Sequence, residues 1–493
     1  YWVAPPPMGD DVNPGSVDQP WATLKYASDT IPDNGCVVWF KNGRYQGNHR
    51  LNRRFTTSAT FQAINPYQVI MENNGAVLNI SGATNMTLEG FIFQHDGPGA
   101  DPLVVIIDGS EKGWAEMITM RNNIFRDSYN NDLLKLLDGV RYATIENNIF
   151  YNQGPNDDHI DVNSVTDITI QDNIFFNDYA GSGRIDPGDT KAFITVKDSN
   201  ENSDGLLGSE RVTIRRNVFL NWQGDSEPFL QIGNDGKPYH EAKDVWIENN
   251  LMIGNSTDDV NTLLAISSAK DVFFTNNTVI GDLPARAYAF RIDRKGLNPQ
   301  NEDLFFYNNI WSDPSGTMGA GPSNSENEFS DGDPADVNNL IIDNNLYWNG
   351  GAVIPPGEVA SPMLDDAHHI VANPLLPTNL DTITLPRWDE TEFLSGSTSI
   401  REEFLRLVLL YGRIPAESAA VDQANPDFAP TDDILGQPRL SPPDLGAYED
   451  ISIDFSSILY LPFVIKEKDV STKQESHLCH WHVSTIDNDI YRP

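Results

Sequence analysis

A short pattern of polar and apolar positions recurs along more than half of this chain. Each copy has two polar residues followed by two mostly apolar ones, as in Asp172-Asn173-Ile174-Phe175. The second polar position is always asparagine, and these asparagines are Asn123, Asn148, Asn173, Asn217, Asn250, Asn277, Asn309 and Asn345. A motif that returns at intervals of 25 to 44 residues indicates a repeat protein.

An alternating apolar segment lies just before each copy, for example Ile168-Thr169-Ile170 before Asn173. Alternation predicts a strand with one buried face, so one repeat fits a coil of two or three short strands with the surplus residues in loops. Stacked coils place equivalent residues about 4.8 Å apart, which allows the asparagine amides to be satisfied in series. An aromatic stack is predicted on the core side, formed by Phe93, Phe125, Phe150, Phe175 and Phe219. The predicted fold is an all-β, right-handed parallel β-helix.

The repeats and the segments around them divide the chain into regions. We expect an N-terminal cap and first strand at residues 1–47, the β-helix at 48–350, a loop-rich segment that packs back on the solenoid at 351–455, and a tail at 456–493.

Two helices are predicted outside the repeats. The first, around Pro20–Ala27, would cover the open end of the solenoid. The second spans Ser399–Tyr411, has one apolar face and stops at Gly412. It is expected to cap the other end or to contact a partner.

The charge balance narrows the class of partner. With 33 Lys and Arg against 71 Asp and Glu, the net charge is −38, which disfavours nucleic acid and anionic membranes because phosphate contacts need cationic side chains. No apolar run reaches the roughly 20 residues of a membrane span. The two cysteines define no disulfide framework. The chain begins at Tyr1 without Met, as a protein does after signal-peptide removal, so we expect a secreted, extracellular or cell-surface protein.

The tail carries two further signals. The apolar run Ser457–Lys466 resembles segments with which secreted bacterial proteins associate with a cell surface or matrix. A cluster that follows it has the side-chain types that hold zinc or copper: His477, Cys479, His480 and His482. The alternative is that the tail is accessory.

The longest interval between ladder asparagines is the 44 residues from Asn173 to Asn217, and function in a solenoid usually resides on such loops. Just before it, Asp157, Asp158 and Asp161 fall within five residues at the start of a strand. Three carboxylates there can converge on a hard cation, calcium being the best fit. The alternative is that these aspartates are ordinary turn and surface residues.

The chain resembles the pectate-lyase-like β-helix superfamily over nearly its whole length, and Asp157-x-x-x-Asp161 followed by a strand resembles the calcium-binding stretch of pectate lyases. The resemblance implies a calcium ion that bridges protein and uronate, and a neutral Lys or Arg that removes the acidified proton in β-elimination. Lys191, and after it Lys197, are the candidate bases.

Two departures from the pectate lyase pattern concern the base. The arginine-rich run of many pectate lyases is replaced by Ser226-Glu227-Pro228-Phe229-Leu230-Gln231. In another group of pectate lyases a lysine follows a strand phenylalanine, whereas Ile194 follows Phe193 here.

A second resemblance concerns the same stretch. Asp157-Asp158-His159-Ile160-Asp161-Val162-Asn163-Ser164 resembles a segment of polygalacturonases, in which paired carboxylates and a third from the preceding rung perform inverting hydrolysis. The resemblance makes Asp158 a candidate catalytic group and Asp132 the carboxylate of the preceding rung. The Gly-His-Gly of those enzymes reads Gly181-Ser182-Gly183 here, without the histidine.

Other residues are candidates for binding an acidic polysaccharide. Arg184 and Arg291 can contact sugar carboxylates, and Trp222 can stack on a sugar ring if it is exposed. For Arg291 the alternative is pairing with Asp282 or Asp293. Two classes of function therefore remain open: an enzyme that cleaves an acidic polysaccharide, by lyase or hydrolase chemistry, and a catalytically silent surface, matrix or glycan-binding solenoid.

Overall fold

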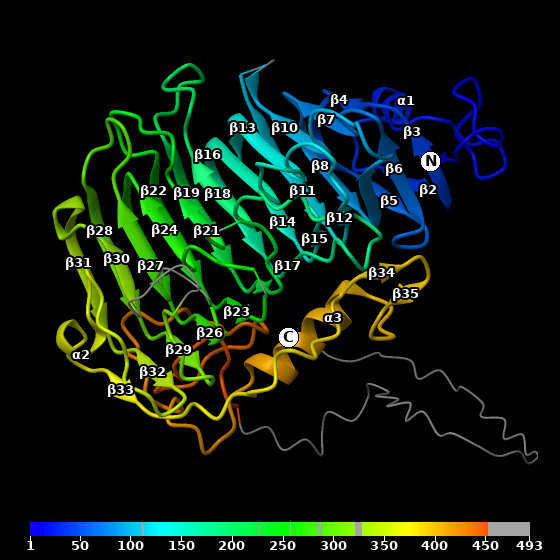
Figure 1. Cartoon of the computed structure of the whole chain (residues 1–493). Helices are drawn as coiled ribbons and strands as arrows, with labels where there is room; N and C mark the ends of the chain where they lie inside the picture. Colours follow the sequence, from blue (N-terminus) through cyan, green and yellow to red (C-terminus); the bar gives the residue numbers. More distant parts are fainter. Residues whose placement is uncertain (111–112, 226, 257, 284–286, 321–327, 452–493) are drawn as a thin grey trace, which may run out of the picture. The chain divides into compact units, whose positions relative to one another are not determined.

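The structure, a computed structural model, describes residues 1–451 except 111–112, 226, 257, 284–286 and 321–327, and these form one unit. This unit is the predicted right-handed parallel β-helix, whose strands stack in parallel ladders (Figure 1). The tail at 456–493, with its histidine and cysteine cluster, lies outside the described residues. Among the described helices, none is long and apolar enough to span a membrane.

Each coil contributes strands to three ladders, and the long strand β16 bends so that it belongs to the first two. The first ladder runs through β4 (His49–Leu51), β7 (Leu78–Ser81), β10 (Val105–Asp108), β13 (Leu134–Arg141), β16 (Ile160–Gln171), β18 (Ile194–Lys197), β21 (Leu230–Ile232), β24 (Leu264–Ser267), β27 (Phe290–Asp293) and β30 (Ser330–Gly332). The second runs through β1 (Trp2–Val3), β2 (Val37–Phe40), β5 (Arg54–Ala63), β8 (Thr84–Glu89), β11 (Ala115–Arg121), β14 (Thr144–Glu146), β16, β19 (Ser209–Arg215), β22 (Ala242–Glu248), β25 (Ala269–Thr275), β28 (Asn301–Tyr307) and β31 (Val337–Asp343).

The third ladder forms a separate sheet on the remaining side of the coil. It runs through β3 (Gly43–Gln46), β6 (Val69–Asn73), β9 (Phe91–His95), β12 (Ile124–Arg126), β15 (Ile149–Tyr151), β17 (Ile174–Phe176), β20 (Val218–Phe219), β23 (Leu251–Gly254), β26 (Thr278–Gly281), β29 (Ile310–Asp313), β32 (Leu346–Asn349) and β33 (Ile370–Val371). A small antiparallel pair, β34 (Trp388–Asp389) and β35 (Glu392–Phe393), follows in the C-terminal segment.

The predicted asparagine ladder lies at the bend between the second and third ladders. From Asn148 onward, each ladder asparagine accepts the backbone N–H of the previous one through its side-chain oxygen, as Asn173 does from Asn148 at 2.9 Å. Its side-chain nitrogen donates back to a carbonyl of the preceding rung, for example from Asn173 to Ile145 at 2.8 Å. The carboxylate of Asp366 ends the ladder by accepting from Asn345. Buried polar groups are thus satisfied in series.

The residue before each ladder asparagine has a left-handed backbone, with φ of 57° at Asp172 and 53° at Asn147. Asn and Asp tolerate this conformation better than most residues, which explains why the first polar position is usually one of them. The predicted phenylalanine stack is confirmed on the core side of the third ladder. Its ring centroids are 4.5 to 5.2 Å apart.

The outer face of the third ladder is also buried, because the C-terminal segment covers it. Apolar residues there, such as Ile124 and Ile174, share a core with Phe404 and Leu407 of α3 (Ile400–Leu407). Figure 1 shows α3 beside β17 and β23, and Gly412 packs directly against Leu251 of β23. Within the described residues the predicted second helix therefore covers a side of the solenoid and not its end.

The ends of both predicted helices have clear local causes. The side chain of Ser399 accepts from the backbone of Glu402, whose carboxylate accepts from Ser399 in return, and this capping box begins α3. A π-helical turn continues α3 and ends at Gly412, the predicted stop. The first helix, α1 (Leu24–Thr30), begins after Thr23, whose hydroxyl accepts from Tyr26, and not near Pro20 as predicted.

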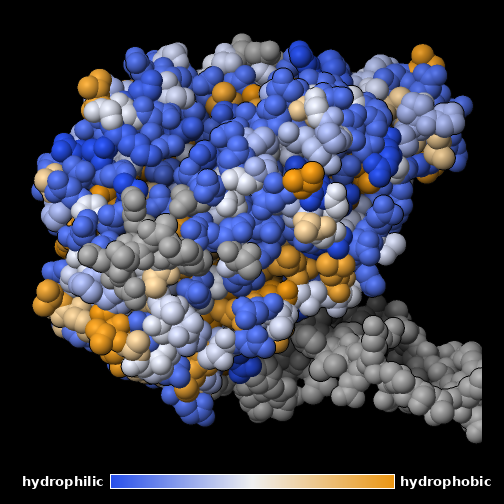
Figure 2. All heavy atoms as spheres, viewed as in Figure 1, coloured by the Kyte–Doolittle hydropathy of each residue, from blue (hydrophilic) through white to orange (hydrophobic). Residues whose placement is uncertain are grey.

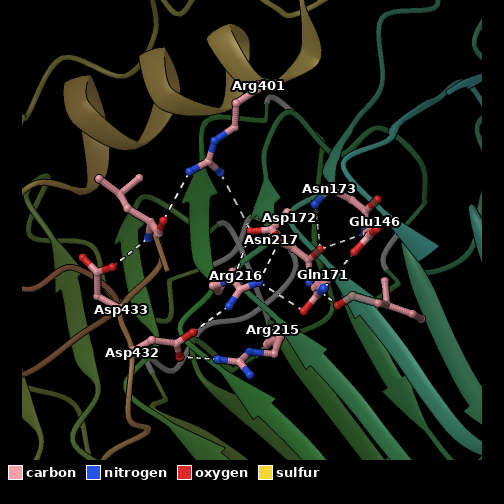
Figure 3. A network of polar contacts seen from close by, with 12 residues as sticks. Glu146, Gln171, Asp172, Asn173, Arg215, Arg216, Asn217, Arg401, Asp432 and Asp433 are labelled. Atoms are coloured by element: carbon pink, nitrogen blue, oxygen red, sulfur yellow. Dashed lines mark hydrogen bonds and ion pairs between the residues drawn. The ribbon is translucent and has the colours of Figure 1, made fainter. Parts of the chain in front are cut away.

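Ion pairs attach the C-terminal segment to the rungs, as Figure 3 shows. Arg216 donates to Asp172 at 2.8 Å and to Asp432 at 2.6 Å, and Asp432 also pairs with Arg215. Arg215 and Arg216 come from the solenoid, whereas Asp432 comes from the returning segment. In Figure 2 most of the visible surface is hydrophilic, and hydrophobic residues gather toward the side where the C-terminal segment lies.

Candidate functional site

Four aspartates from two neighbouring rungs converge on the first ladder. Ile160 and Val162 point into the core, so Asp161 projects from the outer face of β16. Asp132 precedes β13, and its Oδ1 accepts the backbone N–H of Asp158 at 3.0 Å. The Oδ1 of Asp158 accepts the hydroxyl proton of Thr195 at 2.9 Å. The strand register therefore collects carboxylates that are up to 29 residues apart in sequence.

Three of these carboxylates are almost completely buried. The exposed fractions of Asp132, Asp158 and Asp161 are 0%, 5% and 2%, and Asp157 is partly exposed. Burial without full compensation penalises the charged form of a carboxyl group. It raises the pKa of Asp157 to about 6 and that of Asp158 to about 8, and the charge of Asp161 adds to both effects. Burial and the charge of Asp161 also raise the pKa of Asp132 well above its ordinary value.

Lysines surround the cluster. Lys135 lies directly opposite Asp161 in the register between β13 and β16 and forms an ion pair with its Oδ2. Lys197, at the end of β18, has its Nζ 3.9 Å from the same oxygen and 3.9 Å from Asp235. Lys191 lies before β18, its backbone N–H donates to the carbonyl of Asp157 at 3.1 Å, and its side chain pairs with Glu227 at 2.5 Å. The charges of Lys135, Lys197 and Lys191 all act on Asp157, so the three ammonium groups share one neighbourhood.

The two lysines on the strands differ from Lys191 in their surroundings. Burial acts to lower the pKa of Lys197, but the carboxylates of Asp161, Asp158 and Asp235 outweigh it and hold that pKa above its ordinary value. The same balance, with Asp161 and Asp132 as the carboxylates, raises the pKa of Lys135. Lys191 has the most exposed side chain of the three, at 40% against 22% for Lys135 and 19% for Lys197.

The donor chemistry of the cluster fits a hard divalent cation, although no three His, Cys, Asp or Glu side chains of the described residues are placed as a formed metal site. Oδ1 of Asp161 and Oδ2 of Asp132 are buried and accept no hydrogen bond from the described residues. Buried carboxylate oxygens without donors are costly, and a bound cation would satisfy them. Asp161 and Asp132 are therefore the two aspartates whose surroundings fit a bound cation, and metal binding by Asp157 and Asp158 stays a prediction.

Two of the predicted sugar-binding residues serve the fold. Trp222 is fully buried in the core, and its indole N–H donates to the carbonyl of Lys191 at 3.1 Å, so its ring cannot stack on a sugar. The guanidinium of Arg184 donates to the carbonyls of Ser128 and Asn152 at 2.6 and 3.0 Å and lies over the ring of Tyr129. The side chain of Arg184 is only 7% exposed, so it packs between rungs and does not face a bound sugar.

Arg291 does lie on the outer face of the first ladder, on the same row as Asp161. The row passes through Thr195, Gln231 and Ala265 before it reaches Arg291 on β27. Four strand spacings of about 4.8 Å separate the two residues, roughly 19 Å along the solenoid. Arg291 lies 3.5 Å from Asp293 and 3.4 Å from Asp331, so one of its predicted acidic partners, Asp293, is a neighbour.

Lys135 and Thr195 are the site residues that the sequence did not identify. Neither lies in a motif, and each becomes part of the cluster only through strand register. The sole sequence signal for Lys135 was its alternation with Leu134 and Leu136, which predicts an outward side chain.

A cavity of about 430 Å³ lies away from this cluster, at the N-terminal end of the solenoid. It is lined by residues of α1 and of the β3–β4 region, including Lys25, Tyr26 and His49. Asp11, also in its lining, accepts the backbone N–H groups of Ala22 and Thr23 at 2.8 and 3.0 Å just before α1. Its carboxylate is thus used to fix the start of the helix.

Comparison with known proteins supports the fold. Neither a protein-family model nor a curated protein matches the sequence. Among solved structures, pectate lyase Pel9A is similar over 91% of this chain and 96% of its own, with a TM-score of 0.51 and 13% identity. XylC in complex with xylose is similar over 92% and 98%, with a TM-score of 0.46 and 10% identity. An alginate lyase from Paenibacillus sp. is similar over 57% and 90%, with a TM-score of 0.42 and 15% identity. The chain therefore shares the parallel β-helix fold of pectate lyase Pel9A.

Proposed function

We propose that this protein cleaves an acidic polysaccharide by β-elimination at the cluster of Asp132, Asp157, Asp158 and Asp161. The observation that carries the proposal is that Lys135 and Lys197 both form ion pairs with the buried Asp161 in a chain of net charge −38. Ammonium groups at this place attract and orient a uronate carboxylate. Calcium held by the aspartates would withdraw charge from that carboxylate and so acidify the proton beside it.

Lys197 is the better candidate for the base that removes this proton. Its ammonium group is close to Asp161, whereas Lys191 is more exposed and engaged by Glu227. A lysine must lose its own proton before it can accept one. Because burial acts to lower the pKa of Lys197 and the aspartates raise it, any neutralisation of those carboxylates favours the neutral amine. The proton then moves from the sugar carbon to Lys197 Nζ, a carbon–carbon double bond forms, and the bond from the neighbouring carbon to the glycosidic oxygen breaks, with that oxygen taking up a proton from water.

Hydrolysis is the second candidate, and the state of Asp158 favours it. With a pKa of about 8, Asp158 is mostly protonated at pH 7 and can act as a general acid. Asp132, from the preceding rung, is in hydrogen-bond contact with the same residue and provides the third carboxyl group of the arrangement. A lyase forms an unsaturated sugar, whereas a hydrolase adds water, so the products separate these chemistries.

The test is an incubation of the full chain with polygalacturonate, alginate and other uronic-acid polymers, each with calcium or with EDTA. We expect absorbance from an unsaturated uronate with at least one polymer and its loss in Asp161→Asn. Glu302→Gln, in a partly exposed ion pair with Lys270 on the second ladder, is the matched control and should keep full activity. Absence of an unsaturated product from every polymer would refute the proposal, and binding without cleavage would favour the silent solenoid.

A further inference from the structure

Lys135 stands between two buried carboxylates that come from neighbouring rungs. Its Nζ forms an ion pair with Oδ2 of Asp161 and lies 3.6 Å from Oδ2 of Asp132. The two aspartates are 2% and 0% exposed, whereas the lysine side chain is 22% exposed and so reaches the surface. A positive charge attached to the chain thus occupies the space where these two carboxylates converge.

No other cation of the described residues is so close to both aspartates. Lys197 is 3.9 Å from Asp161 and shares its charge with Asp235. The compensation by Lys135 is nevertheless incomplete, because Oδ1 of Asp161 and Oδ2 of Asp132 accept no hydrogen bond from the described residues. These oxygens keep the capacity to bind a hard cation, but such a cation would meet the ammonium group of Lys135.

We propose that Lys135 is a built-in counter-ion that competes with calcium for Asp132 and Asp161 and thereby sets the calcium affinity of this site. The inference deepens the proposed function and rests on it for the choice of calcium as the ligand. When calcium is absent, Lys135 compensates the buried carboxylates. When calcium binds, the ammonium group has to move toward solvent, which its partial exposure allows.

The strength of the competition follows from charge and distance. A positive charge about 4 Å from a divalent cation opposes binding even at an effective dielectric constant of about 20. Solvent and side-chain movement reduce this effect, so we expect roughly a tenfold or greater gain in calcium affinity when the charge of Lys135 is removed. A purely structural ion pair predicts the opposite, because its loss only destabilises the pocket.

Isothermal titration of the metal-free full chain with calcium chloride measures this directly and needs no polysaccharide. Lys135→Met removes the charge at similar length and should bind calcium roughly tenfold or more tightly than the wild type. Lys135→Arg keeps the charge and should bind like the wild type. Lys270→Met removes the charge of an outward lysine on the second ladder, paired with Glu302, and controls for net charge.

Thermal unfolding in EDTA and in calcium provides the second readout. Lys135→Met should be less stable than the wild type in EDTA and should gain more from calcium. If it does not fold in EDTA, Lys135→Gln takes its place in both experiments. Equal or weaker calcium binding in the charge-removed variant, including no binding by either protein, would overturn the proposal. If the variant gains affinity but no polymer is cleaved, the inference about Lys135 stands and the proposed enzymatic function falls.

Discussion

Lys197 and Asp161 lie on adjacent strands of the first ladder, with the lysine Nζ 3.9 Å from the carboxylate Oδ2. Their positions in the register are diagonal, since Lys197 is opposite Asn163 and Asp161 is opposite Thr195. The side chain of Lys197 therefore leans along the strand toward the aspartate cluster. This relationship places the proposed base beside the aspartates that, in the proposed function, would hold calcium.

The first prediction separates the two candidate bases. Lys197→Ala should lower kcat by about a thousandfold or more, because the group that accepts the proton is lost. Lys191→Ala should change the rate by less than about tenfold and act mainly on KM, since Lys191 can only attract the substrate. Initial rates of unsaturated product at saturating polymer measure both. If Lys191→Ala were inactive and Lys197→Ala were active, Lys191 would be the base and Lys197 would only attract the substrate.

The second prediction concerns the asparagine ladder. Asn173→Ala removes the acceptor for the backbone N–H of Asn148 and the donor to the carbonyl of Ile145, all in buried positions. We expect a loss of about 2–4 kcal/mol in the free energy of unfolding. Urea denaturation followed by circular dichroism measures it, with Asn338→Ala on the exposed part of β31 as the control. Equal stabilities of the two variants would show that the ladder contributes little.

The third prediction concerns the attachment of the C-terminal segment. Asp432→Ala removes the shared partner of Arg215 and Arg216. Because the pairs are partly exposed, we expect a loss of about 1–2 kcal/mol and faster proteolysis after this segment opens. Limited proteolysis with mass mapping measures it, and Asp427→Ala at an exposed site in the same segment is the control. Identical cleavage rates would mean that apolar packing under α3 alone holds the segment.

The fourth prediction is a pH dependence at His49, far from the aspartates. Burial lowers the pKa of His49 below its ordinary value of 6.5, and a hydrogen bond to the Tyr45 carbonyl opposes this only in part. The neutral form is therefore favoured in the folded state. The stability it provides is complete above pH 6.5 and is lost as the pH falls below that value.

His49→Gln should make the unfolding free energy fall less steeply between pH 6.5 and pH 5, by up to about 1.4 kcal/mol per pH unit. Urea denaturation at several pH values measures the slopes. The same slope in the variant and the wild type would show that His49 does not titrate on unfolding in this range.

The repeat pattern was sufficient to predict the fold, because each ladder asparagine and each stacked phenylalanine repeats a local rule of the coil. The burial of Trp222 could not be predicted from the sequence. As an aromatic residue, Trp222 was predicted to stack on a sugar ring. The left-handed backbone at Asn221 instead turns the chain at a second bend, where the Asn221 side chain donates to the Asn177 carbonyl at 2.6 Å. The indole thereby enters the core, where Gly224 gives it room.

The site could be predicted only in the part that is contiguous in sequence. Asp157, Asp158 and Asp161 were identifiable because they cluster within five residues. Lys135 was not, because its place beside Asp161 depends on which residues of β13 and β16 face each other, and loops of variable length conceal that register. The outcome for the second helix has a similar cause: its apolar face was evident, but the apolar outer face of the third ladder that it covers was not.

The measurement that tests the central claim most directly is the mass of the oligosaccharides released from an acidic polysaccharide by the full chain. β-Elimination predicts fragments whose new non-reducing end is lighter by one water molecule than a hydrolysis product, and their disappearance with Lys197→Ala. Fragments with the mass of hydrolysis products would contradict the lyase account and would make Asp158 and Asp132 the catalytic groups of a hydrolase. Intact polymer from every uronate substrate would contradict enzymatic cleavage altogether.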